Sequence, residues 1–191
     1  MNLVAFQRIA LAGFGPYREW VEFELKANMN NYVAENERGK SSLVMGILAI
    51  LFGLPASGDP SRFGTARFRN WESAGRFAGE VEFKVSGALY KIERNFETNE
   101  IGLYRMERTG WQQLVGGTHN PLSAKPNQEY EEYLRKLLHV TSRDIFIATF
   151  CVTQPMPEAR EIDDRVQSLI AGGEIHFAGV LENLAGELTP I

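Results

Sequence analysis

The chain contains the sequence Ala34-Glu35-Asn36-Glu37-Arg38-Gly39-Lys40-Ser41, in which a glycine, a lysine and a hydroxyl residue follow one another. A loop of this kind holds the anionic oxygens of a triphosphate with backbone N–H groups at the start of a helix. Gly39 lets the backbone approach the ligand, Lys40 reaches the outer phosphates, and the hydroxyl of Ser41 ligates Mg²⁺. We therefore predict a site for a nucleoside triphosphate with Mg²⁺.

The segments on either side of this loop have the order that the motif requires. Residues 29–34 are predicted to form a short strand that leads into the loop. Residues 41–52 are dense in Leu, Ile, Val, Met and Ala and predict a buried helix, which Gly53 and Pro55 end. Alanine stands at position 34, where the strict pattern has its first glycine, and the relaxed form of the pattern tolerates this change.

Alternating and helical periodicities predict the other elements. Strands are expected at residues 2–12 and 20–25, and residues 55–76 are expected to form an exposed loop. Two hairpins are expected, at 77–85 with 89–96 and at 101–108 with 111–115, turning at Ser86-Gly87 and Thr109-Gly110. Helices are expected over residues 130–138, from Thr141 or Ser142 to Phe150, and over 162–170. The order predicts an α/β P-loop NTPase with a mixed core sheet, an additional antiparallel sheet and a helical subdomain.

Composition limits the classes of function. The chain has 191 residues, 44% of them hydrophobic and 23% charged, which suits a globular domain with a core. The net charge of −4 argues against a stand-alone nucleic-acid binder. The only cysteine, Cys151, excludes an internal disulfide. We find no secretory signal, and the longest apolar run, residues 43–54, is too short to cross a bilayer, so a cytoplasmic protein without membrane contact is expected.

One segment has a local positive charge. Residues 60–76 combine arginines with Phe63, Phe68 and Trp71. Basic and aromatic side chains together are typical of surfaces that bind nucleic acid or a nucleotide base. The residues expected to make that contact are Arg62, Arg67 and Arg69. An ordinary solvated loop explains the same composition equally well.

With Ser42 and Leu43 included, the glycine-lysine loop resembles that of the SMC-like ATPases, a family that includes SbcC-type DNA-repair ATPases and YhaN-like proteins. Residues 11–17 and 21–23 are similar to the opening strands of that family. The resemblance implies the N-terminal lobe of an ABC-type head that binds ATP and Mg²⁺, and acts in DNA repair, recombination or chromosome maintenance. The implied nucleotide-binding residues are Ala34, Glu35, Asn36, Glu37, Arg38, Gly39, Lys40, Ser41 and Ser42.

A second, more distant similarity covers residues 133–154. It looks like the helical segment that ends in the family's Q-loop, where a glutamine lies near Mg²⁺ and the attacking water. The resemblance therefore implies that Gln154 and Lys40 act in catalysis, and that Ser41 and Gln154 contact Mg²⁺. Gln154 is followed by Pro155-Met156-Pro157, where relatives have Gly-Glu, and a solvated loop glutamine is the alternative.

The sequence also lacks parts that such a head uses. We find no apolar run ending in Asp-Glu and no serine-glycine-glycine signature, which in this family belong to a C-terminal lobe encoded after a coiled coil. Residues 1–174 are thus expected to form the N-terminal lobe. Residues 175–191 are expected to begin a coiled coil that is cut short, because Phe177, Leu181, Leu184 and Leu188 are spaced 4, 3 and 4 apart.

The resemblance further implies partners. They are the C-terminal lobe of the same ATPase, a second head in an ATP-dependent head-to-head homodimer, DNA and a nuclease subunit. The fragment alone is expected to hydrolyse almost no ATP. Two alternatives stay open: a scaffold module that binds nucleotide without hydrolysing it, and a P-loop kinase or GTPase of another class.

Overall fold

The computed structural model describes residues 4–26, 29–33, 35, 38–72, 75–140 and 142–150. The chain divides after Thr141 into two compact units, of which the first contains every strand among the described residues. The predicted helix at 162–170, the expected coiled coil after residue 175 and Gln154 all lie outside the described residues.

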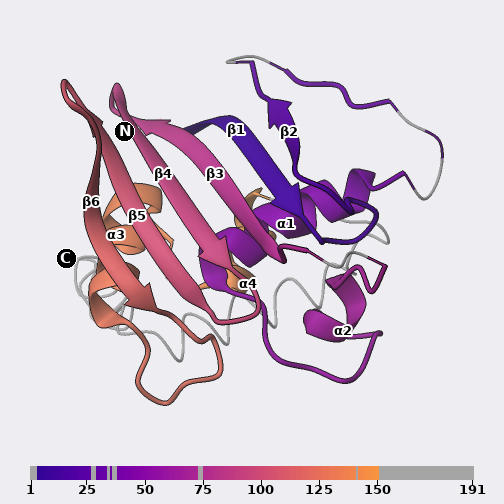
Figure 1. The fold of residues 1–191 in the computed structure, drawn as a ribbon. Coiled ribbons are helices and arrows are strands. Elements are labelled where there is room, and N and C mark those ends of the chain that lie inside the picture. Colours follow the sequence, from indigo (N-terminus) through magenta and orange to yellow (C-terminus); the bar gives the residue numbers. More distant parts are fainter. Residues whose placement is uncertain are drawn as a thin grey trace, which may run out of the picture. The chain divides into compact units, whose positions relative to one another are not determined.

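Six strands form one antiparallel sheet in the order β2-β1-β3-β4-β5-β6 (Figure 1). Their bounds are β1 Val4–Ala12, β2 Val21–Glu24, β3 Ala78–Val85, β4 Ala88–Asn95, β5 Glu100–Glu107 and β6 Gly110–Thr118. The helices are α1 Lys40–Phe52, α2 Thr65–Phe68, α3 Gln128–Leu138 and, in the second unit, α4 Arg143–Phe150. None of these helices is long and apolar enough to cross a membrane.

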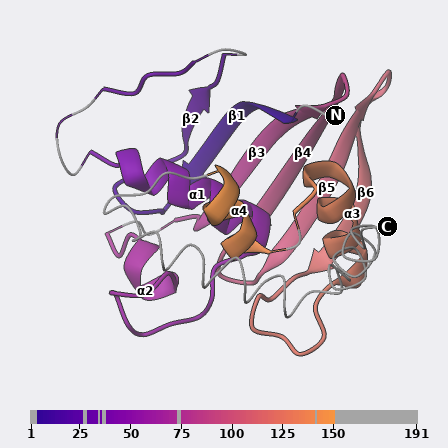
Figure 2. The same ribbon diagram turned by 180° about the vertical axis from the view of Figure 1, so that it is seen from behind.

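Helices α1 and α3 cover one face of the sheet, as the view from behind shows (Figure 2). Helix α1 packs against β3 and β4, and α3 packs against β6. Leu11 and Val81 are fully buried on this face. Gly46 lets α1 approach β1 closely, because a Cβ at this position would lie 2.6 Å from Cδ1 of Leu11. The contact fixes α1, and with it the loop at its N-terminus, against the sheet.

The opposite face of the sheet is polar. On this face, Arg8 of β1 forms ion pairs with Glu22 at 3.1 Å, Glu80 at 2.7 Å and Glu82 at 2.8 Å. Side chains of successive strand residues point to opposite faces, so these charges alternate with the buried apolar residues. The alternation that predicted the strands is therefore explained by one apolar and one polar face.

Helices α3 and α4 begin with side-chain caps. In α3, Oδ1 of Asn127 accepts a hydrogen bond from the backbone N–H of Tyr130 at 3.1 Å. In α4, the hydroxyl of Ser142 accepts one from the N–H of Ile145 at 3.3 Å. Capping by Ser142, one of the two residues proposed from sequence, is confirmed.

Parts of the predicted fold differ from the structure. Residues 29–33 are not in a strand, and no mixed core sheet occurs among the described residues. A strand needs a hydrogen-bonded neighbour, and here none of the six strands pairs with this segment. The region 55–76 is not simply an exposed loop, since it contains α2 and buries Phe68. The second hairpin turns at Arg108-Thr109, because Gly110 already pairs with Glu107.

Candidate nucleotide-binding site

Gly39 stands directly before α1 in a left-handed conformation with φ of 92°. This region of backbone space favours glycine. A side chain would also collide with the preceding turn, because a Cβ at Gly39 would lie 2.7 Å from both Cγ of Pro16 and the hydroxyl of Tyr17. The Tyr17 hydroxyl donates a 2.9 Å hydrogen bond to the carbonyl of Gly39. Two independent features thus require glycine at the position that the motif predicts.

The N-terminus of α1 is open to an anion. Helix α1, which is described throughout, has neither an acidic residue in its first turn nor a side-chain cap. Its first N–H groups have no partner within the helix, and the helix dipole places partial positive charge there. Lys40 and Ser41 are exposed at this end, and Ser42 is half-buried. The residues present therefore suit a triphosphate with Mg²⁺.

Lys40 lies back along the loop that precedes it. Its Nζ donates a 2.9 Å hydrogen bond to the backbone carbonyl of Glu35. Glu35 also forms an exposed ion pair with Arg38 at 3.5 Å, and exposed pairs of this kind contribute little to stability. Of the predicted loop, Ala34, Asn36 and Glu37 lie outside the described residues. The described part brings Glu35, Arg38, Lys40 and Ser41 together at the helix start.

Sequence reasoning gave no role to the turn at residues 13–17, which supports this loop. Its backbone closes on itself, since the N–H of Phe14 donates to the carbonyl of Tyr17 at 3.1 Å. Gly15 lies against α1, because a Cβ there would be 2.8 Å from the hydroxyl of Ser42. The side chain of Phe14 is buried and stacks on Phe68 with ring centroids 4.8 Å apart. The signal in the sequence was Gly13-Phe14-Gly15-Pro16, which lies within the residues 11–17 that resemble the opening strands of the SMC-like ATPases.

A family model described as an AAA domain matches residues 8–165. The chain belongs to this AAA-domain family. No curated protein matches the chain. Membership makes the chain a P-loop NTPase of α/β class and an ATPase nucleotide-binding module. Binding of the phosphates at the helix start Gly39-Lys40-Ser41 stays a prediction from the sequence motif.

A buried arginine holds the C-terminal end of α1. Arg94 of β4 is 2% exposed, and its Nε donates to the carbonyl of Ile50 at 2.8 Å. Its Nη1 donates to the carbonyl of His119 at 2.9 Å. The Tyr130 hydroxyl, from α3, donates to the carbonyl of Leu51 at 2.7 Å. The last turn of a helix leaves carbonyls without partners, and these two side chains satisfy them.

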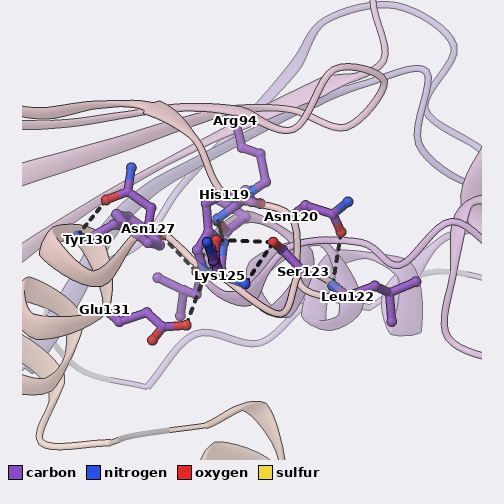
Figure 3. Close-up of polar contacts among 11 residues, drawn as sticks. Arg94, His119, Asn120, Leu122, Ser123, Lys125, Asn127, Tyr130 and Glu131 are labelled. Atoms are coloured by element: carbon purple, nitrogen blue, oxygen red, sulfur yellow. Dashed lines mark hydrogen bonds and ion pairs between the residues drawn. The ribbon is translucent and has the colours of Figure 1, made fainter.

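His119 joins this network on the far side of Arg94 (Figure 3). Its Nδ1 lies 3.1 Å from Nη2 of Arg94. Because a guanidinium only donates, Nδ1 must accept, so the neutral ring carries its hydrogen on Nε2, which faces Glu131 at 3.4 Å. Burial, and then the charge of Arg94, lower the pKa of His119 to about 4. The ring is neutral at physiological pH.

This network was not predicted. No role was predicted for His119 from the sequence, and among the described residues no group of three or more His, Cys, Asp or Glu is arranged to hold a metal. Arg94 falls on the apolar face of β4 together with Ile92, and that placement was the available signal. Recognising its partners needs the position of the α1 C-terminus, which the sequence does not supply.

The three arginines expected to contact DNA or a base are each engaged in local contacts. Arg62 pairs with Asp59 at 3.2 Å. Nη1 of Arg67 donates to the carbonyl of Ser61 at 3.3 Å. Arg69 forms an ion pair with Glu97 and lies over the ring of Trp71. Acidic neighbours partly neutralise Arg62 and Arg69, and a role of the three arginines in DNA binding stays a prediction.

Proposed function

We propose that this AAA-domain chain is the ATP-binding half of an SMC-like ATPase head, and that a C-terminal lobe must complete it before ATP is hydrolysed. The single observation that carries the proposal is the segment leading into the phosphate loop. Met29 is 86% exposed and Val33 is 96% exposed, and the segment pairs with none of the six strands. Apolar residues so placed are typical of a surface that another element covers.

Helix α1 supports the same proposal. It is apolar on all sides, a composition typical of a helix that is buried all round. Val44 is nevertheless 40% exposed. A mixed core sheet completed by strands of a second lobe would cover both this face of α1 and the exposed segment. The proposed lobe would also supply the acidic residue and the serine-containing signature that the chain lacks.

In the proposed site, backbone N–H groups at the start of α1 and the ammonium of Lys40 hold the phosphate oxygens. Ser41 would ligate Mg²⁺, which when bound neutralises charge on the phosphates. Gln154 would orient the water and contact the metal. ATP then joins two heads in a homodimer, each phosphate loop facing the signature of the other. DNA and a nuclease are the proposed partners, on the basis of the SMC-like resemblance.

The test compares the 191-residue chain with an extended protein, in which this chain is joined to a C-terminal lobe of the proposed kind. We expect the 191-residue chain to bind Mg-ATP with almost no turnover. The extended protein is expected to hydrolyse ATP, to dimerise with ATP as measured by light scattering, and to respond to DNA. Turnover by the short chain equal to that of the extended protein would refute the need for a second lobe. ATP binding without hydrolysis or dimerisation in either form would favour the scaffold alternative.

A further inference from the structure

Trp71, in the segment between α2 and β3, is 76% exposed, whereas Trp20 and Trp111 are half-buried. A single exposed apolar side chain needs no explanation by itself. The surroundings of Trp71 do suggest a role for it, because the residues before it are hydrogen-bonded to a turn that contacts the phosphate loop.

Asn70, next to Trp71, is bonded twice to the turn at residues 13–17. Its backbone N–H donates to the carbonyl of Gly13 at 2.8 Å, and its Nδ2 donates to the carbonyl of Gly15 at 2.7 Å. A third bond joins the N–H of Gly15 to the carbonyl of Phe68 at 2.6 Å. The backbone that carries Trp71 is thus fixed to this turn on both sides of Arg69.

The same turn touches the start of α1. Gly15 lies against Ser42, and Tyr17 bonds to the carbonyl of Gly39. One short turn therefore links the exposed tryptophan to the residues that would hold the phosphates. The path from Asn70 to the start of α1 is thus made of hydrogen bonds and close contacts.

The chemistry around Trp71 favours a flat, uncharged ligand. The guanidinium of Arg69 lies 5.4 Å from the centre of the Trp71 ring and is itself held by Glu97 and by the ring of Phe77. Glu72 is paired with Arg18. Because acidic partners neutralise Arg69 and Arg18, these two side chains offer little positive charge to a nucleic-acid backbone. An aromatic face beside a guanidinium does suit stacking of a nucleobase.

We infer that Trp71 is the stacking platform for the base of the nucleotide whose phosphates lie at Gly39-Lys40-Ser41. The inference rests on nucleotide binding at the phosphate loop and extends it to a residue that recognises the base. Stacking depends on the aromatic surface alone, so purine nucleotides other than ATP would also use Trp71. A triphosphate without a base would bind without contacting Trp71.

The experiment compares Mg-ATP with Mg-tripolyphosphate, which has the phosphates but no base, by isothermal titration calorimetry. We expect Trp71→Ala to weaken ATP binding about tenfold and to leave tripolyphosphate binding unchanged. Trp71→Phe, which keeps an aromatic face, should recover most of the ATP affinity. Trp111→Ala, on β6, is the matched control and should change neither affinity.

Each other result overturns the inference in a recognisable way. If Trp71→Ala leaves ATP affinity intact, the base does not stack there. If it weakens both ligands equally, Trp71 only supports the phosphate loop. If it abolishes binding of a single-stranded oligonucleotide while ATP binding persists, the surface contacts DNA instead. If the unaltered protein binds neither ATP nor tripolyphosphate, nucleotide binding itself fails, which is distinct from the first three results.

Discussion

Protonation of His119 is expected to destabilise the fold, because the buried ring must stay neutral to accept from Arg94. The pKa of His119 is lowered from 6.5 to about 4. In the unfolded chain the ring takes up a proton as the pH falls below its ordinary pKa, whereas in the folded chain it does not do so until near pH 4. Stability from this residue is therefore complete above the ordinary pKa and is lost as the pH falls toward the lowered one.

The size of the effect follows from the pKa difference. One pKa unit corresponds to about 1.4 kcal/mol, so His119 accounts for a loss of about 3 kcal/mol in the free energy of unfolding on going from neutral pH to about pH 4. That is a large part of the stability of an ordinary domain, for which about 5–15 kcal/mol is typical. Carboxylates that form ion pairs in the fold add their own loss at low pH, so the wild-type curve alone does not isolate His119.

The assay is urea unfolding followed by tryptophan fluorescence at a series of pH values. His119→Asn keeps an acceptor for Arg94 but does not titrate, so its stability should fall less steeply with acid than that of the wild type. His139→Asn is the matched control, since His139 is exposed and has φ of 56°, a conformation that asparagine tolerates. Parallel pH curves for wild type and His119→Asn would refute the assignment of a neutral His119 in the network.

Three further changes test other parts of the structure. Gly39→Ala should lower the free energy of unfolding by about 1 kcal/mol or more, and with it the melting temperature, and should also weaken ATP binding. The reason is that the left-handed backbone and the contact with Tyr17 both exclude a side chain. An unchanged melting temperature and ATP affinity would contradict this geometry. Tyr130→Phe should lower the free energy of unfolding by about 1 kcal/mol in urea, since the buried carbonyl of Leu51 loses its 2.7 Å hydrogen bond and keeps only the 3.5 Å one from Nη2 of Arg94; a neutral result would contradict a stabilising role for the hydroxyl. Val33→Ser should leave the stability of this chain within about 0.5 kcal/mol but weaken its association with the proposed C-terminal lobe in a pull-down; equal association would place the interface elsewhere.

The phosphate loop and the sheet hairpins could be predicted because local rules determine them. Gly39-Lys40-Ser41 stands at a helix start, as the motif predicts. The turn at Ser86-Gly87 has positive φ at both residues, which suits the tight hairpin expected from its sequence. The predicted strand at residues 29–34 failed for the opposite reason, because a strand depends on a neighbour as well as on its own residues.

Long-range contacts account for most of what could not be predicted. Arg94 was hidden within an alternating strand, and only the carbonyls at the end of α1, 43 and 44 residues away, explain its burial. The turn at residues 13–17 gains its role from Gly39 and Ser42, which the sequence separates from it by a whole strand and a loop. Of the candidate catalytic residues, Lys40 lies at the described site, and the position of Gln154 stays a prediction.

The most direct test of the central claim, that ATP binds through Lys40 at the start of α1, is the affinity of Lys40→Ala for Mg-ATP measured by calorimetry. A charge-assisted contact to phosphate contributes about 1.5–3 kcal/mol, so the account predicts a loss of about ten- to a hundredfold, with an unchanged melting temperature. Lys84→Ala, an exposed lysine of β3, should leave the affinity as it is. Equal ATP affinity in Lys40→Ala and wild type would contradict the account.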